Sequence, residues 1–172
     1  FTITNSPPLQ TLYAGTNVTL FITLGDPTLM SNVVNLSLSV LPPGFGAHFS
    51  TNAVTGTGQA MLTMSISNSV RPYLYVFSVN GASAGVTHMA FFKINVLPPP
   101  VINGAAVVGK NFIFNGTGGS PGVAYQVLEA GNVTLPLDEW TVVATNFFDG
   151  DGGFNFSGDM SAPEQFFRLR VR

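Results

Sequence analysis

The sequence Val96-Leu97-Pro98-Pro99-Pro100-Val101 divides the chain into two parts. Three consecutive prolines hold φ near about −65° and donate no backbone hydrogen bonds, so they do not fit inside a sheet. Such a run favours an extended polyproline II segment, which is a stiff spacer. We therefore predict two domains, residues 1–97 and 101–172, joined by a proline-rich linker at residues 98–100.

Before the prolines, apolar residues alternate with Thr, Ser and Asn over short stretches. These stretches are residues 18–24, 34–40, 60–66, 75–79 and 90–96. A period of two predicts half-buried β-strands. Turn-forming residues separate the stretches, among them Gly25-Asp26-Pro27 and Asn80-Gly81. Many short strands joined by turns predict an antiparallel β-sandwich for this part.

The second part repeats this pattern with more aromatic residues. The sets that share a face are Phe112 and Phe114; Tyr125, Val127 and Glu129; Trp140, Val142 and Ala144; Phe154 and Phe156; and Phe167, Leu169 and Val171. Glycine-rich loops separate them at residues 116–122 and 149–153. The whole chain is therefore predicted to be all-β, with two tandem antiparallel β-sandwich domains.

The composition excludes two classes of partner. Charged residues make up 8% of the chain and the net charge is −2, so a basic stripe for nucleic acid is missing. Mean hydropathy is +0.35, yet no apolar run approaches the roughly 20 residues of a spanning helix. We expect neither nucleic-acid binding nor a membrane span. Arg168, Arg170 and Arg172 fall on one face of the last strand, as expected for a solubilising edge strand.

The absence of cysteine excludes disulfides, thiol nucleophiles and cysteine-ligated metals. A small secreted eukaryotic domain more often carries a disulfide, so this composition favours a bacterial source. Phe1 already lies in a strand pattern and no signal peptide precedes it. We expect the chain to be part of a longer protein.

Residues 1–97 resemble the bacterial immunoglobulin-like repeats of secreted multidomain proteins. The stretches that carry the resemblance are Leu36-Ser37-Leu38-Ser39-Val40-Leu41-Pro42-Pro43-Gly44, His48-Phe49-Ser50, Leu62-Thr63-Met64-Ser65-Ile66, and residues 75–81 and 87–96. The resemblance implies an immunoglobulin-like sandwich that acts as a spacer or binding module, and it implies no catalytic residues.

Residues 101–172 resemble a small C-terminal β-module of large secreted bacterial proteins. The matching features are Gly118-Gly119-x-Pro121-Gly122, Trp140, Phe148-Asp149, Gly153-Phe154 and Phe166-Phe167-Arg168-Leu169. This resemblance implies a position and a context, secreted or at the cell surface, and it implies no activity.

The sequence Asp149-Gly150-Asp151-Gly152 is open to two interpretations. Alternate carboxylates are typical of calcium loops, so Asp149 and Asp151 are candidate ligands of a weak Ca²⁺ site. An EF-hand would need a glutamate at loop position twelve, where this chain has Met160. The other interpretation is a glycine-rich β-turn, since Asp and Gly both suit turns. Apart from this calcium ion, no cofactor is expected.

Exposed aromatic rings are the second group of candidate binding residues. Trp140 either stacks on a sugar or anchors the small second core, because Val142 and Ala144 are predicted to share its face. Phe21, Phe91 and Phe166, with Met89, lie opposite the predicted inward sets. Such residues form sugar-binding platforms or apolar patches at interfaces.

No catalytic constellation is evident. His48 and His88 are the only histidines, and no Gly-x-Ser-x-Gly elbow occurs. We therefore expect a non-catalytic accessory region that spaces, stabilises or tethers neighbouring domains of the same parent protein, with weak affinity for a polysaccharide. The alternatives are a dedicated carbohydrate-binding module and a structural or adhesive subunit of a surface assembly, in which edge strands pair with other chains.

Overall fold

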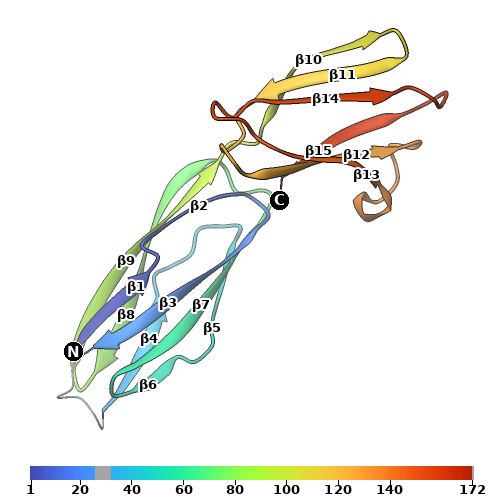
Figure 1. Cartoon of the computed structure of the whole chain (residues 1–172). Coiled ribbons are helices and arrows are strands. Elements are labelled where there is room, and N and C mark those ends of the chain that lie inside the picture. The colour runs from blue at the N-terminus through green and yellow to red at the C-terminus, as the bar shows by residue number, and fades with distance from the viewer. Residues whose placement is uncertain (26–31, 172) are drawn as a thin grey trace. The chain divides into compact units, whose positions relative to one another are not determined.

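The structure is a computed structural model that describes residues 1–25 and 32–171. Contacts between Cα atoms divide the chain into two compact units, Phe1–Pro98 and Pro99–Arg172 (Figure 1). The division falls inside the linker predicted at residues 98–100. Asp26 and Pro27 of the predicted turn lie outside the described residues.

The described strands of the first unit form two sheets. Their bounds are β1 (Thr2–Ser6), β2 (Leu9–Tyr13), β3 (Asn17–Gly25), β4 (Val33–Leu38), β5 (Phe45–Phe49), β6 (Ala53–Thr55), β7 (Gly58–Ile66), β8 (Tyr73–Ser83) and β9 (Val86–Leu97). One sheet has the order β1-β3-β7-β5 and the other the order β2-β9-β8-β4-β6. The first corresponds to the ABED sheet of an immunoglobulin-like sandwich, and β9-β8-β4 corresponds to the facing GFC sheet.

One strand pair departs from the predicted antiparallel pattern. Pro7 and Pro8 separate β1 from β2, and the chain crosses from one sheet to the other at this point. As a result β2 pairs with the last strand of the unit, β9, in parallel, from Leu9↔Lys93 to Tyr13↔Leu97. Proline favours such a crossing because it cannot continue a ladder of hydrogen bonds.

The core of the first unit lies between the two sheets. The predicted alternating residues fill it, including Leu20, Ile22, Leu62, Met64, Phe92 and Ile94. Phe77 packs at its centre, with ring centroids 5.3 Å from Phe92 and 5.2 Å from Phe45. The prediction of inward faces is therefore confirmed for β3, β7, β8 and β9. The set at residues 34–40 ends early, since Val40 lies beyond β4 and is exposed.

The turn predicted at Asn80-Gly81 is wrong. Both residues lie inside β8, where Gly81 pairs with Leu36 on one side and His88 on the other. A Cβ atom at Gly81 would lie 3.1 Å from Val34 Cγ1 of the same sheet and 3.4 Å from Ile3 Cδ1 of the facing sheet, so the glycine permits close packing at this point. The chain turns instead at Ala84 and Gly85, both of which have positive φ.

The second unit is a smaller sandwich. Its strands are β10 (Val101–Val108), β11 (Asn111–Thr117), β12 (Ala124–Ala130), β13 (Thr141–Phe147), β14 (Phe154–Asp159) and β15 (Phe166–Val171), with the 3-10 helix η2 (Leu137–Glu139) before β13. Among the described residues, β10-β11-β14 form one antiparallel sheet and β13-β12-β15 the other. The predicted all-β architecture of two tandem sandwiches is confirmed, apart from the parallel β2–β9 pair.

Aromatic rings form the core of the second unit. Phe114, Tyr125, Phe148, Phe154 and Phe156 are buried together, with Phe112 and Phe167 at its margin. The Tyr125 hydroxyl donates to the Asn155 backbone carbonyl at 3.0 Å, which links β12 to β14 across the sandwich. A buried tyrosine usually finds such a partner for its hydroxyl group.

Two glycine loops meet next to this core. The Gly119 N–H donates to the Gly152 carbonyl at 2.9 Å. A Cβ atom at Gly152 would lie 2.2 Å from the Gly119 oxygen, and one at Gly119 would lie 2.0 Å from Phe148 Cδ1. Only glycine permits backbones to approach this closely. These glycines are therefore explained by packing.

Candidate functional site

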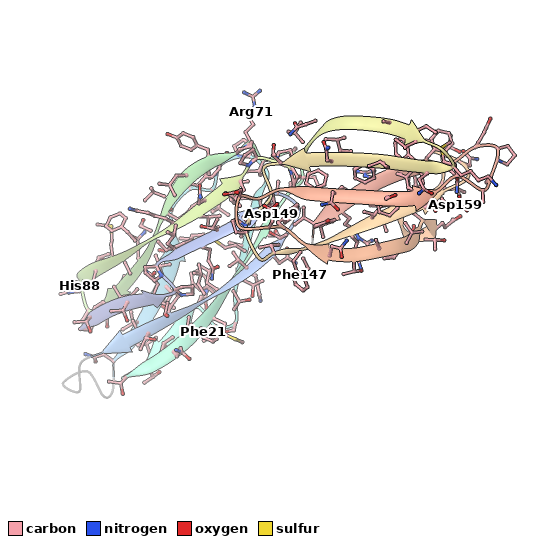
Figure 2. All side chains as sticks on the ribbon, turned by 45° about the horizontal axis from the view of Figure 1, so that its top comes forward. Phe21, Arg71, His88, Phe147, Asp149 and Asp159 are labelled. Carbon is pink, nitrogen blue, oxygen red and sulfur yellow. The ribbon has the colours of Figure 1, made fainter. Side chains whose placement is uncertain are left out.

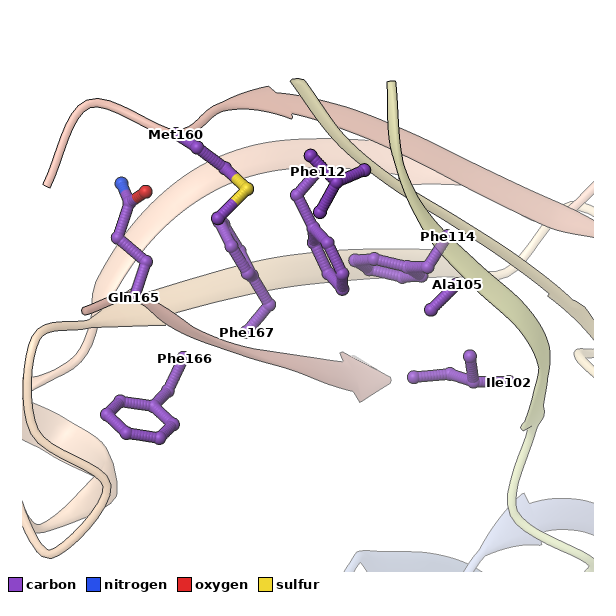
Figure 3. Close-up of a pocket in the computed structure, with 9 residues that line it drawn as sticks. Ile102, Ala105, Phe112, Phe114, Met160, Gln165, Phe166 and Phe167 are labelled. Carbon is purple, nitrogen blue, oxygen red and sulfur yellow. The ribbon is translucent and has the colours of Figure 1, made fainter. Parts of the chain in front are cut away.

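An apolar groove opens on one side of the second unit. It has a volume of about 310 Å³. The lining comes from β10, β11, β15 and the segment before β15: Ile102, Ala105, Val107, Phe112, Phe114, Met160, Gln165, Phe166 and Phe167. Figure 3 shows the rings of Phe112, Phe114 and Phe167 gathered on one side, with Ile102 and Ala105 approaching from β10. The volume is at the lower end of the range for ligand pockets.

The segment between β14 and β15 closes one end of this groove. The Met160 N–H donates to the Lys110 carbonyl at 2.7 Å, which attaches the segment to the β10–β11 hairpin. The Gln165 side-chain amide donates to Glu129 Oε1 at 2.7 Å. Gln165 Oε1 is buried and has no hydrogen-bond partner within residues 1–25 and 32–171. The groove therefore combines apolar walls with one polar end.

The candidate aromatic residues lie on three different surfaces. Phe21 is 41% exposed on the outer face of β3, opposite Met61 of β7 (Figure 2). Phe91 is 61% exposed on β9, in the other sheet of the same unit. Phe166 is half-buried on β15 of the second unit, and its ring points away from Phe112 (Figure 3). These rings do not form a single row.

Phe91 belongs instead to an apolar patch. Leu74 and Val76 of β8 lie on the same outward face as Met89 and Phe91 of β9, as the register of the two strands shows, and Leu9 of β2 adjoins them beside Lys93. All five apolar residues are exposed. We call them, Leu9, Leu74, Val76, Met89 and Phe91, the β8–β9 patch. Patches of this kind mark interaction surfaces in soluble proteins.

Of the two interpretations of Trp140, the one that makes it an anchor of the second core is wrong, because Trp140 is not part of that core. A β-bulge interrupts the register of β13, since Val127 pairs with Ala144 whereas the next residue, Leu128, pairs with Val142. The extra residue breaks the face that Trp140, Val142 and Ala144 were predicted to share. Trp140 is half-buried just before β13, and its indole N–H donates to the Leu135 carbonyl at 3.1 Å.

The Asp149 side chain stabilises the turn in which the candidate calcium ligands, Asp149 and Asp151, lie (Figure 2). Its Oδ1 accepts the backbone N–H groups of Asp151 at 3.0 Å and of Gly153 at 2.7 Å. In the part of the chain that the structure describes, no group of three His, Asp or Glu side chains is placed to hold a metal ion. This geometry favours a turn, as expected of a short acidic side chain that bonds to the next backbone amides.

Substitution of Asp149 should therefore destabilise the second unit more than substitution of Asp151. We expect Asp149→Ala to lower the free energy of unfolding by about 1 kcal/mol, the usual effect of losing a side-chain acceptor for two backbone amides. Asp151→Ala serves as the control and should change it by less than about 0.5 kcal/mol. Urea denaturation with and without added Ca²⁺ measures both. Stabilisation of the unsubstituted chain by Ca²⁺, lost in both variants, would establish the calcium site instead.

The two histidines are far from a catalytic arrangement. His88 is exposed at the start of β9, where its ring contacts Phe1 at a centroid distance of 4.7 Å. His48 is exposed on β5 of the other sheet. The acidic residues of the second unit lie mainly in turns and at strand ends. No helix in the described ranges combines the length and the hydropathy needed to cross a membrane.

The sequence-based analysis missed the groove. The available signal was β10, in which Val101, Ile102, Ala105, Ala106, Val107 and Val108 place apolar side chains on both faces. Such a strand is typical of a buried position between two layers. In the structure every residue of β10 is exposed, so an apolar strand is left without a cover.

Comparisons with known proteins identify no family. No family model matches the chain, and no curated protein matches it. Several solved structures are weakly similar to the chain. The D0-D1 domain of intimin is 15% identical, with a TM-score of 0.38, and the match covers 99% of this chain and 90% of that one. The D1-D4 ectodomain fragment of ICAM-5 is 10% identical with a TM-score of 0.39, over 99% of this chain and 49% of that one.

An enzyme is also among the similar structures. The VesB protease of Vibrio cholerae is 15% identical with a TM-score of 0.40, and the match covers 51% of this chain. The chain spans only 29% of the length of that protease. Identities and TM-scores this low carry no argument about what the chain does.

Proposed function

We propose that the chain is a non-catalytic accessory region of a secreted or cell-surface multidomain bacterial protein. In this role it spaces and tethers a neighbouring domain of the same protein. The β8–β9 patch is the observation that supports the proposal. It places five exposed apolar side chains on one sheet face, in a unit whose only charged residues are Asp26, Arg71 and Lys93. Lys93 lies between Val76 and Leu9 on this face and is the one charged side chain among the five apolar ones. A face that is otherwise so apolar suits a permanent contact with another domain.

A polysaccharide is the second candidate partner. Phe91 is the one aromatic residue of the patch, and its exposed ring can stack on a sugar. A single ring of this kind would give weak affinity, because Phe21 lies on the opposite sheet and adds nothing to the same surface. A dedicated carbohydrate-binding module therefore ranks below the accessory role.

Retention on insoluble polysaccharides distinguishes the accessory role from the carbohydrate-binding module. We expect the purified chain to remain in solution when mixed with cellulose, chitin, xylan or agarose, with or without Ca²⁺, and to release no soluble sugar. Retention on one of them, lost in Phe91→Ser and kept in Phe147→Ser, would establish the carbohydrate-binding module. Phe147 is a matched control because it is an exposed ring in the second unit. Release of soluble sugar would contradict the non-catalytic role.

A further inference from the structure

The two sheets of the second unit are displaced by one strand. Phe112 of β11 stacks on Phe167 of β15 with ring centroids 5.1 Å apart, so β15 faces β11. The Tyr125 hydroxyl bonds to the Asn155 carbonyl, so β12 faces β14. In the sheet β10-β11-β14, the strand that remains is β10. No described strand of the second unit faces β10.

The uncovered side of β10 forms a wall of the groove. Ile102, Ala105 and Val107 line it, yet Val107 is 60% exposed. The position that would cover them lies beside β15, in the sheet β13-β12-β15, where β15 is the terminal strand. One added strand would therefore extend this sheet and complete the sandwich beneath β10.

We propose that the free edge of β15 binds an extended strand of a partner protein, in which apolar side chains alternate with acidic ones. Alternate residues of an edge strand direct their N–H and C=O groups away from the sheet, and these groups bind the backbone of the added strand. The alternate apolar side chains of that strand point into the groove, against Ile102 and Val107. This proposal concerns the second unit and does not depend on the function proposed above.

The side chains of the bound strand that point away from the groove lie beside the arginines of β15, and we therefore expect them to be acidic. Arg168 and Arg170 lie on the outward face of β15, opposite Leu128 and Gln126 of β12. Arg170 donates to Gln126 Oε1, with Nε at 3.1 Å. The Arg168 side chain is exposed and has no hydrogen-bond or ion-pair partner in the described ranges. An acidic residue directly across from Arg168 would form a cross-strand pair of opposite charge, which stabilises neighbouring strands.

A second copy of this chain fits the edge less well. Two copies of β15 that pair about a two-fold axis near the middle of the strand place arginine opposite arginine. With the axis at Leu169, Arg168 of each copy faces Arg170 of the other. Like charges directly opposite destabilise a strand pair. The same arginines that repel a copy attract an acidic strand.

Peptide binding to the full chain tests the proposal. The probe is a fluorescein-labelled hexapeptide, Glu-Val-Glu-Ile-Glu-Val, with Lys-Val-Lys-Ile-Lys-Val as the matched control of opposite charge. We expect fluorescence anisotropy to show saturable binding of the acidic peptide alone, weakened by added salt. Hydrogen exchange should then show new protection of alternate backbone amides in β15. Equal binding of both peptides, or no binding of either, would overturn the proposal.

Matched variants locate the binding site. Val107→Gln should weaken binding of the acidic peptide about tenfold, because a polar side chain then lines the groove. Val108→Gln is the control, since Val108 is 59% exposed, follows in sequence and is not part of the lining. Arg168→Glu should transfer the preference to the basic peptide, whereas Lys110→Glu should not.

Two other outcomes would count against the proposal. If Val107→Gln and Val108→Gln bind equally well, the groove does not receive the peptide. If light scattering shows that the unsubstituted chain forms dimers that Arg168→Glu strengthens, the edge pairs with a second copy. All four substituted positions are exposed or at a hairpin end, and circular dichroism should show unchanged folding.

Discussion

Phe114→Ala should unfold the second unit and leave the first intact. Phe114 is 2% exposed, and its ring contacts Phe112, Phe154 and Phe156. Truncation of a buried phenylalanine costs about 3–5 kcal/mol. The core of a unit this small rarely supplies more than about 5 kcal/mol of net stability. The two units have separate cores, so the first should keep its own transition.

The position of Trp140 makes this result measurable. Trp140 is the only tryptophan and lies in the second unit. Its fluorescence therefore follows unfolding of that unit alone, whereas calorimetry follows both units. Phe77→Ala is the matched variant in the first unit, where Phe77 is also 2% exposed. Phe77→Ala should lower the calorimetric transition temperature of the first unit and leave the unfolding transition seen by Trp140 fluorescence unchanged. Loss of both transitions in either variant would show that the units unfold as one.

Gly152→Ala should also destabilise the second unit strongly. Gly152 has φ of +75°, which costs a non-glycine residue about 1 kcal/mol. The added Cβ atom would also lie 2.2 Å from the backbone oxygen of Gly119, which cannot move as a flexible side chain would. Overpacking of this kind adds about 1–3 kcal/mol. We expect Gly152→Ala to lower the free energy of unfolding by about 2–4 kcal/mol in total.

Gly122→Ala separates the two contributions. Gly122 has φ of +74°, and nothing lies within 4 Å of the Cβ atom it would gain. Gly122→Ala should therefore lower the free energy of unfolding only by the cost of the positive φ, about 1 kcal/mol. Urea denaturation followed by Trp140 fluorescence measures both variants in the same unit. If Gly152→Ala and Gly122→Ala lower the free energy of unfolding equally, the loops of Gly119 and Gly152 do not approach as closely as described.

The sequence predicted the strands and the inward faces better than the turns. Alternation over several residues reports burial directly, and Leu20, Ile22, Phe92 and Ile94 are buried as predicted. Asn80-Gly81 is a strong local turn signal. It was overridden because pairing with β4 and β9 continues past it and the sheet packs closely there. Tertiary pairing of this kind is not visible in a local pattern.

The candidate site depended still more on tertiary structure. The β-bulge in β13 changed the environment of Trp140, and a single inserted residue leaves no clear mark in the sequence. The groove arises from the one-strand displacement of the two sheets. That displacement follows from which strands face each other across the core, and alternation alone does not determine it. Arg168 and Arg170 lie on one face of β15 as predicted, whereas Arg172 lies outside the described residues. A binding role for the two arginines could be proposed only once the groove beside β15 was known.

The parallel pairing of β2 with β9 also affects how the first unit carries mechanical load. The chain enters β2 at Leu9 and leaves β9 at Leu97, and these residues lie at opposite ends of the pair, since Leu9 adjoins Lys93 and Tyr13 adjoins Leu97. Tension applied at Leu9 and at Leu97 pulls β2 and β9 along their length in opposite directions. The hydrogen bonds between them then bear the force together in shear, whereas a hairpin under tension opens one bond at a time.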